Sequence, residues 1–339
     1  TISPNRRELC RQVAHFNPGT LVLLDNTENN LFDIEQELKE RFPDIKQFAE
    51  LTDIRDEIHI KRVFDLYHPQ VVFHAAAYKH VPMMERFPEH AVSNNIHGTY
   101  IVASTAKRYG CETFVFVSTD KAVNPTSVMG ASKRAAELLV QHFNEQCRKE
   151  NLNSRFAAVR FGNVLGSRGS VIPTFKRQIS LGGPVTVTHP DMVRFFMTIP
   201  EAVQLIIQAG SFAKGGEIFV LDMGEPVRIL DLAQDLIRLS GLTPGKDIEI
   251  KLTGIRPGEK LREELFTDQE KMSATRYSRI FVAHNGDTYL DDAEQLLDKV
   301  CHGRGLNNSG EARMFLNVLF PTIEHNLKQD TSQQVTARD

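Results

Sequence analysis

The sequence lacks the features that mark disulfide-rich, metal-binding and membrane-spanning chains. Its 339 residues include only four cysteines, which lie far apart and form no C-x-x-C pair: Cys10, Cys111, Cys147 and Cys301. That spacing fits neither a disulfide framework nor a zinc site, so we expect no metal and buried thiols in a reducing compartment. No apolar run approaches the roughly 18 residues of a membrane helix, and residues 1–7 hold no apolar signal core. We therefore expect a cytoplasmic segment that makes no membrane contact.

Neither sign of charge is in excess. The chain has 40 Lys and Arg residues against 43 Asp and Glu residues, a net charge of −3. A general binder of nucleic acids or membrane surfaces would show a basic excess, so we expect no nucleic-acid partner. With 41% hydrophobic residues, the composition is that of an ordinary globular protein.

Short apolar runs alternate with segments of helical period in the first half of the chain. Continuous apolar runs, without the polar alternation of a half-exposed sheet, occupy residues 21–25, 71–74, 113–118 and 156–161. Helical spacing of apolar residues follows at residues 31–41, 57–67, 91–109 and 133–149. This alternation predicts an α/β fold with a doubly wound parallel sheet.

After residue 162 the pattern changes. Glycine, proline and short mixed segments dominate residues 166–200, and a helix at 201–209 and a buried strand at 217–221 are expected to extend the same sheet. A smaller mixed lobe is expected at about 224–282, with a helix at 229–240, a strand at 248–252 and a loop at 256–260.

Side chains at three successive strand ends suggest a dinucleotide site, because ligands of such sheets bind at the carboxyl ends of the strands. Asp25 suits the hydroxyls of an adenosine ribose, although it also fits a helix N-cap. Asp53, followed by Ile54, could meet an adenine amino group or simply form a turn. A flat cofactor could lie on the small residues Ala75, Ala76 and Ala77, which close packing would also explain. We assign residues 1–165 and 200–222 to a dinucleotide-binding domain, 166–199 and 223–324 to a substrate lobe, and 325–339 to a flexible tail.

The strand at 113–118 ends in four functional side chains, Ser118, Thr119, Asp120 and Lys121. Eleven residues after Ser118, a helix opens at residues 129–133 (MGASK). Its Met129 and Lys133 are four residues apart and therefore share one helical face. A lone lysine on a helix is usually solvated, but the neighbouring strand end favours a functional role.

These segments resemble the extended short-chain dehydrogenase/reductases, whose fold is Rossmann-like. Within them, residues 118–126 (STDKAVNPT) and 129–134 (MGASKR) resemble the large, configuration-retaining UDP-N-acetylglucosamine 4,6-dehydratases of bacterial polysaccharide biosynthesis. Related enzymes carry Tyr-x-x-x-Lys and Thr-Asp-Glu, and Met129 and Lys121 mark this subgroup. The resemblance covers about residues 8–298 and includes 74–82 (HAAAYKHVP), 160–167 (RFGNVLGS), 194–198 (RFFMT) and 256–260 (RPGEK).

The resemblance implies an NAD-dependent lyase that converts UDP-N-acetylglucosamine to a 4-keto-6-deoxy sugar for glycan or lipopolysaccharide synthesis. It implies Asp120 as the acid toward O6, Lys121 as the base at C5 and Thr119 as a hydrogen-bond partner of the C4 oxygen. A direct ion pair would stabilise the charged forms of Asp120 and Lys121, so we expect the two side chains to diverge. Lys133 should fix the nicotinamide ribose. Met129 cannot deprotonate the C4 hydroxyl, so Asp120, Lys121 or a water must do so, with Met129 as apolar packing.

The same motifs suggest which residues hold the ligands. Arg194 and Arg256 are candidates for the diphosphate, because guanidinium groups match phosphate oxygens, although a single arginine is often only solvated. A structural role is equally compatible with His80, and Asn95 resembles the family's buried, site-supporting asparagine. The other candidates for the cofactor are Ser118, and for the sugar, backbone or uridine Lys79, Asn163, Val171 and Glu259.

One departure concerns the family's glycine-rich turn, which holds the NAD pyrophosphate at a helix N-terminus. The matching helix begins near Glu8, and residues 1–7 contain no glycine. We expect residues upstream of the given sequence to supply that turn, and the parent protein to include the membrane region of large family members. Two alternatives remain: a C5-inverting dehydratase or nucleotide-sugar 4-epimerase, and a non-catalytic nucleotide-sugar-binding module. Helices 91–109 and 133–149 resemble those that pair between subunits, so a homo-oligomer is expected.

Overall fold

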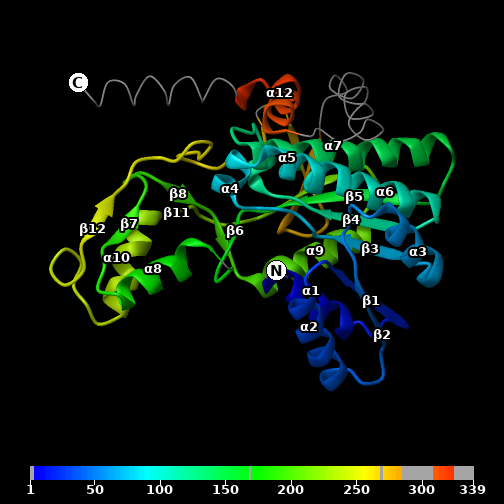
Figure 1. Ribbon diagram of the computed structural model, residues 1–339, viewed down its shortest axis with the longest axis horizontal. Coiled ribbons are helices and arrows are strands. Elements are labelled where there is room, and N and C mark those ends of the chain that lie inside the picture. Colours follow the sequence, from blue (N-terminus) through cyan, green and yellow to red (C-terminus); the bar gives the residue numbers. More distant parts are fainter. Residues whose placement is uncertain (1–3, 168, 268–269, 285–307, 324–339) are drawn as a thin grey trace.

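The computed structural model describes residues 4–167, 169–267, 270–284 and 308–323 and centres on a six-stranded sheet (Figure 1). The strand order is β13-β14-β10-β5-β4-β3. Four neighbours are parallel: β3 (Val71–His74), β4 (Thr113–Val117), β5 (Arg155–Arg160) and β10 (Ile218–Leu221). The last two, β14 (Ile280–His284) and β13 (Lys271–Ala274), pair antiparallel, so the expected wholly parallel sheet is mixed. Antiparallel strands at the edge of a doubly wound sheet are common.

A second, two-stranded parallel sheet lies beside the β3 edge. It consists of β1 (Thr20–Asp25) and β2 (Lys46–Leu51), covered by α2 (Glu28–Arg41). In the described part of the chain β1 pairs with β2 alone, and β3 pairs with β4 alone. Leu24 of β1 nevertheless packs against the hydrophobic cluster of the large sheet, which keeps the carboxyl ends of both sheets close together.

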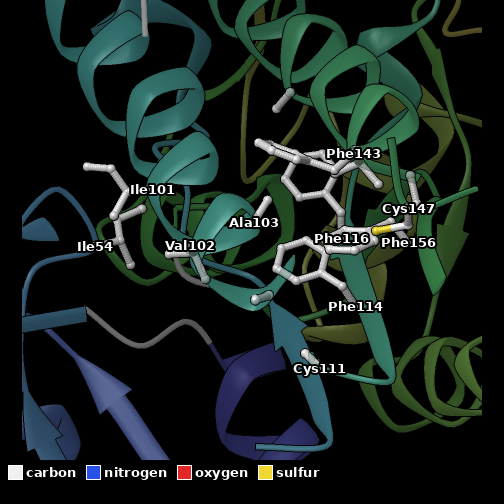
Figure 2. Packing of buried hydrophobic residues seen from close by; sticks show 14 of the residues in the cluster. Ile54, Ile101, Val102, Ala103, Cys111, Phe114, Phe116, Phe143, Cys147 and Phe156 are labelled. Carbon is white, nitrogen blue, oxygen red and sulfur yellow. The ribbon is translucent and has the colours of Figure 1, made fainter. Parts of the chain in front are cut away.

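Helices cover both faces of the large sheet, which explains its continuous apolar strands. Phe114 and Phe116 of β4 pack under α3 (Glu57–Tyr67), α6 (Gly98–Arg108) and α7 (Val128–Lys149), as Figure 2 shows in part. Val115, which alternates with them, packs on the opposite face against α9 (Ile199–Phe212). The first helix, α1 (Pro4–His15), lies against α9.

The helix predicted at 91–109 is interrupted. After α4 (Val81–Arg86) and α5 (Pro88–Ala91), residues Val92–His97 form a π-helical turn, and α6 begins only at Gly98. Wide turns of this kind are frequent at functional sites. Here the turn carries Asn95, whose contacts are described below.

The smaller lobe has its own apolar core. It contains α8 (Val171–Ser180), α10 (Ile229–Leu239) and the parallel pair β7 (Val185–Val187) and β12 (Ile250–Leu252). Two short strand pairs, β6 (Asn163–Val164) with β9 (Phe196–Met197) and β8 (Val193–Arg194) with β11 (Val227–Arg228), lie at its junction with the large sheet. Sequence reading missed α8, because glycines flank it, although Val171, Phe175 and Ile179 have helical spacing.

Several elements of the expected substrate lobe lie on the large sheet instead. Both β13 and β14 belong to that sheet, and α12 (Ser309–Leu319) packs against α5 and α7. The domain boundaries themselves stay a prediction, and the expected tail at 325–339 lies outside the described residues. No helix in the described ranges has the length and hydropathy needed to cross a membrane.

Candidate active site

Two adjoining cavities lie at the carboxyl ends of the strands. The larger, of about 690 Å³, is lined by most of the predicted residues, including Asp25, Ile54, Ala75, Ala76, Ala77, Lys79, His80, Ser118, Thr119, Met129 and Lys133. The smaller, of about 180 Å³, is lined by Arg194, Arg256, Glu259 and Glu263. Lys121 and Asn163 line both cavities and therefore mark their junction. A ligand with a sugar at this junction would reach into both.

Three predicted residues line neither cavity. Val171 packs against the apolar core of the smaller lobe. Asp53 binds Arg55 through both carboxylate oxygens, and these hydrogen bonds lower its pKa to about 2. Asn95 is buried behind the site. Their proposed contacts with ligands stay predictions.

Asp120 and Lys121 do not diverge, contrary to our expectation. Lys121 Nζ donates to Asp120 Oδ1 at 3.0 Å, and Thr119 Oγ1 donates to the same oxygen at 2.8 Å. Asp120 is fully buried, and its Oδ2 has no hydrogen-bond partner among the described residues. The two residues are adjacent in a single 3₁₀ turn that follows β4, which brings their side chains together.

Lys121 is held as an ammonium. Its Nζ also lies 3.4 Å from Asn163 Oδ1 and 3.4 Å from Glu263 Oε1. Burial alone would lower the pKa of Lys121, but the charges of Asp120 and Glu263 outweigh burial and raise that pKa above its ordinary value.

Lys133 lies in a different environment on the same cavity. Its Nζ donates to the Val117 carbonyl at 2.7 Å and sits 3.8 Å from the centroid of the Phe116 ring. Burial lowers the pKa of Lys133 to about 7. Close to neutrality this side chain can therefore either carry or release a proton.

A buried ionic network supports the strand end. Arg160 of β5 is fully buried and forms paired hydrogen bonds with Glu137 of α7 and with Glu270. Ser118 Oγ donates to Glu137 Oε1 at 2.6 Å. Burial acts to raise the pKa of Glu137, but Arg160 outweighs it and holds that pKa at about 2. The network ties the chain at Ser118 to the helix that carries Lys133.

The first turn of α7 is fixed by two caps and one glycine. Ser127 Oγ accepts from the Gly130 N–H, and Glu85 accepts from the Val128 N–H. A Cβ on Gly130 would lie 2.2 Å from the Lys121 carbonyl oxygen, so only glycine allows this approach. Met129, which is 2% exposed, is thereby placed on the cavity between Lys121 and Lys133 in sequence.

Asn95 supports the site through the backbone. Its side chain accepts from the Tyr78 N–H and donates to the Tyr78 carbonyl and to Ser132 Oγ. It therefore joins the loop after β3 to α7, as the resemblance implied. The π-helical turn brings its amide to this position.

Asp25 is engaged by the chain itself. Arg6 Nη1 donates to Asp25 Oδ2 at 3.0 Å, and the Thr27 N–H donates to Oδ1. The carboxylate thus acts as the turn residue that precedes α2, in line with the capping alternative, while still lining the cavity. A ribose at Asp25 would have to share or displace Arg6.

Sequence reading missed some residues that line the cavities. Glu263 lies in a charged LREEL run that resembles a solvated surface, and only the tertiary fold brings it to Lys121. Arg6, Tyr78 and Asn94 also line the larger cavity. Tyr78 and Asn94 immediately neighbour predicted residues, so sequence proximity was a usable signal for these two.

The lining fits a nicotinamide dinucleotide at its two ends. Asp25 and Ile54 lie at one strand end, and Ser118, Met129 and Lys133 at another, with Ala75–Ala77 between them on β3's exit. A cavity of several hundred Å³ is typical of cofactor sites. Among the described residues, no glycine-rich turn precedes α1 to hold a pyrophosphate.

Comparisons with known proteins agree with this geometry. A family model described as "Polysaccharide biosynthesis protein" matches residues 6–285. Capsular polysaccharide biosynthesis protein CapD of Staphylococcus aureus is 53% identical over 81% of this chain and 45% of its own length. A UDP-N-acetylglucosamine 4,6-dehydratase (inverting) of Campylobacter jejuni is 32% identical over 82% of this chain and 79% of its own.

The solved structure of DesIV, a dTDP-glucose 4,6-dehydratase from Streptomyces venezuelae with NAD bound, shares the fold. Its TM-score is 0.65 at 21% identity, covering 77% of this chain and 84% of that one. The chain spans about half the length of the first curated relatives it matches. With a Rossmann-like α/β sheet and a family match over most of its length, the chain belongs to the polysaccharide biosynthesis protein family.

Proposed function

We propose that this chain catalyses the NAD-dependent 4,6-dehydration of UDP-N-acetylglucosamine, with retention of configuration at C5. The observation that carries the proposal is the meeting of Thr119, Asp120 and Lys121 with Met129 and Lys133 at the junction of two cavities. The Campylobacter relative supports the substrate class, and Met129 and Lys121 favour retention over inversion.

The cavities suggest how such a substrate would lie. Arg194 and Arg256 line the smaller cavity and can bind a diphosphate, placing the sugar near Lys121 and Asn163. Arg194 is buried and held by the Val193 and Lys260 carbonyls, so its guanidinium is already oriented. Lys79 and His80 face the same space from the loop after β3.

Bound NAD⁺ would supply the oxidation of C4 to a ketone and the return of the hydride to C6. The ketone makes the C5 proton acidic, so the protein must supply a base at C5 and an acid at O6. Asp120 and Lys121 can provide both after one internal proton transfer. Moving a proton from the Lys121 ammonium to the Asp120 carboxylate, across their 3.0 Å contact, yields a neutral amine and a carboxylic acid.

Substrate binding would favour this transfer. Filling the junction with a sugar removes water from the pair, and a low dielectric disfavours the charged forms of both groups. The direct contact therefore replaces the divergence that we expected from the sequence. Thr119, which donates to Asp120 in this structure, could turn its hydroxyl to the C4 oxygen.

Separate titrations with NAD⁺ and UDP, followed by incubation with UDP-N-acetylglucosamine, test the proposal. We expect both ligands to bind the full-length protein and the sugar to lose one water, as seen by mass spectrometry. Binding of UDP without NAD⁺ or turnover would favour the non-catalytic binding module. A product of unchanged mass with inverted C4 would favour an epimerase.

A further inference from the structure

Glu263 is an acidic side chain of the site that no motif assigned. It lies between β12 and β13, next to Arg262, whose backbone pairs with Val193 of β8. Its side chain is 3% exposed and lines the smaller cavity. This segment of the smaller lobe therefore presents a carboxylate to the strand end of the large sheet.

The contacts of Glu263 connect two proposed functional groups. Its Oε1 lies 3.4 Å from Lys121 Nζ and 3.8 Å from Arg194 Nε. Its Oε2 is buried and has no hydrogen-bond partner in the described ranges. Lys121 thus faces two carboxylates, that of Asp120 at 3.0 Å and that of Glu263.

The charges around Lys121 are closely balanced. The carboxylates of Asp120 and Glu263 face it, together with the cations Arg194 and Lys79, and Lys260 faces Glu263. Without the charge of Glu263, one carboxylate would stand against two neighbouring cations. The ammonium form of Lys121 depends on this second carboxylate.

We propose that Glu263 is a positioning residue that holds Lys121 as an ammonium in the resting site and sets how readily the Asp120–Lys121 pair transfers its proton. The inference rests on the proposed function for its chemical meaning. Because the same Oε1 lies near Arg194, a diphosphate that draws on that guanidinium would change the field at Lys121. Glu263 would in this way connect substrate binding to the proton transfer.

The direct test is an NMR titration of protein labelled with ¹³C at the lysine ε-carbons, with the Lys121 signal assigned by its absence in Lys121→Arg. We expect Glu263→Gln to lower the titration midpoint of Lys121 by about one to three pH units, since a nearby opposite charge shifts a pKa by that much. Glu264→Gln is the matched control, because Glu264 is about half exposed and pairs with Lys260 rather than Lys121. An unchanged Lys121 midpoint in folded Glu263→Gln would overturn the proposal.

Glu263→Asp keeps the test open if the glutamine variant does not fold. Its carboxylate is drawn back by one methylene, so we expect a smaller shift in the same direction, and no shift would again contradict the role.

The pH dependence of turnover provides a second readout. If Lys121 is the base, the rate rises with pH through its titration, and Glu263→Gln should move that rise to lower pH by a similar amount. A uniform loss of kcat at every pH, with no displacement, would indicate a merely structural role. If the parent protein converts no sugar, the proposed function fails, whereas the NMR titration still decides the role of Glu263.

Discussion

The protonation of individual lysines sets what the site can do. Lys121 and Lys133 line the same cavity, yet paired carboxylates hold one as an ammonium while burial brings the pKa of the other to about 7. Sequence motifs predicted that both lysines would matter. They could not predict this difference, because it depends on Glu263 and on the Phe116 ring, which the fold brings in.

Burial of Lys133 should cost stability at neutral and acidic pH. Its folded pKa of about 7 is below the ordinary value near 10.4, so the unfolded chain binds the additional proton between these values. The cost is full below pH 7 and disappears as the pH rises through that window. We expect the free energy of unfolding of Lys133→Met, relative to the parent, to fall by about 1–3 kcal/mol between pH 6 and pH 10.

Urea unfolding at several pH values measures this difference. Lys149→Met, on the same helix but 71% exposed, is the control and should show no such trend. A pH-independent difference for Lys133→Met would mean that Lys133 is charged in the folded protein.

Met129 tests whether another group has replaced the family's phenol. Its side chain is 2% exposed and packs among Val128, Ala131 and Leu139. We expect Met129→Tyr to leave turnover at or below the parent level and to lower Tm, because overpacking a buried site is destabilising. The exposed Met314→Tyr serves as the control for Tm. A large gain in turnover would show that the site still needs a phenol at this position.

Elements position these residues through close packing that a sequence does not display. The strands were predicted well, since apolar runs buried on both faces are distinctive, and β3 has the predicted bounds. The π-helical turn and α8 were not predicted, because their geometry depends on tertiary contacts of Asn95 and on a separate small core. The tight contact of α7 with Lys121 is of the same kind.

Gly130→Ala tests that contact. The added Cβ would lie 2.2 Å from the Lys121 carbonyl oxygen, so the turn that carries Asp120 and Lys121 must move. We expect kcat to fall at least about tenfold, since small displacements of reacting groups are costly, and Tm to fall as well. Gly19→Ala, with no atom within 4 Å of its Cβ, should change neither. Unchanged kcat in Gly130→Ala would show that this approach does not fix the catalytic turn.

Arg160 tests the ionic network between β5 and α7. Arg160→Met would leave Glu137 and Glu270 without their shared guanidinium in a buried site. Breaking a buried ion pair from one side costs about 3–5 kcal/mol, so we expect a loss of that order in the free energy of unfolding. Arg148→Met, on an exposed pair of α7, should cost less than about 1 kcal/mol. Similar small losses in both variants would show that the network contributes little.

At the scale of the whole molecule, two bodies of chain share one site. The large sheet supplies Asp120 and Lys121, and the smaller lobe supplies Arg194 and Glu263. Fold class and most lining residues could be predicted from motifs and strand ends, because parallel strands end at one edge. The cross-lobe contacts could not, since nothing in a linear pattern relates residue 263 to residue 121. The expected homo-oligomer and the cofactor turn stay predictions.

The most direct measurement of the central claim is the reaction of UDP-N-acetylglucosamine in deuterated water, followed by NMR at C5. The account predicts a 4-keto-6-deoxy product that has gained deuterium at C5 with the original configuration, and no exchange when Lys121 is replaced by glutamine. Inverted C5, a C4 epimer, or continued exchange in Lys121→Gln would contradict it.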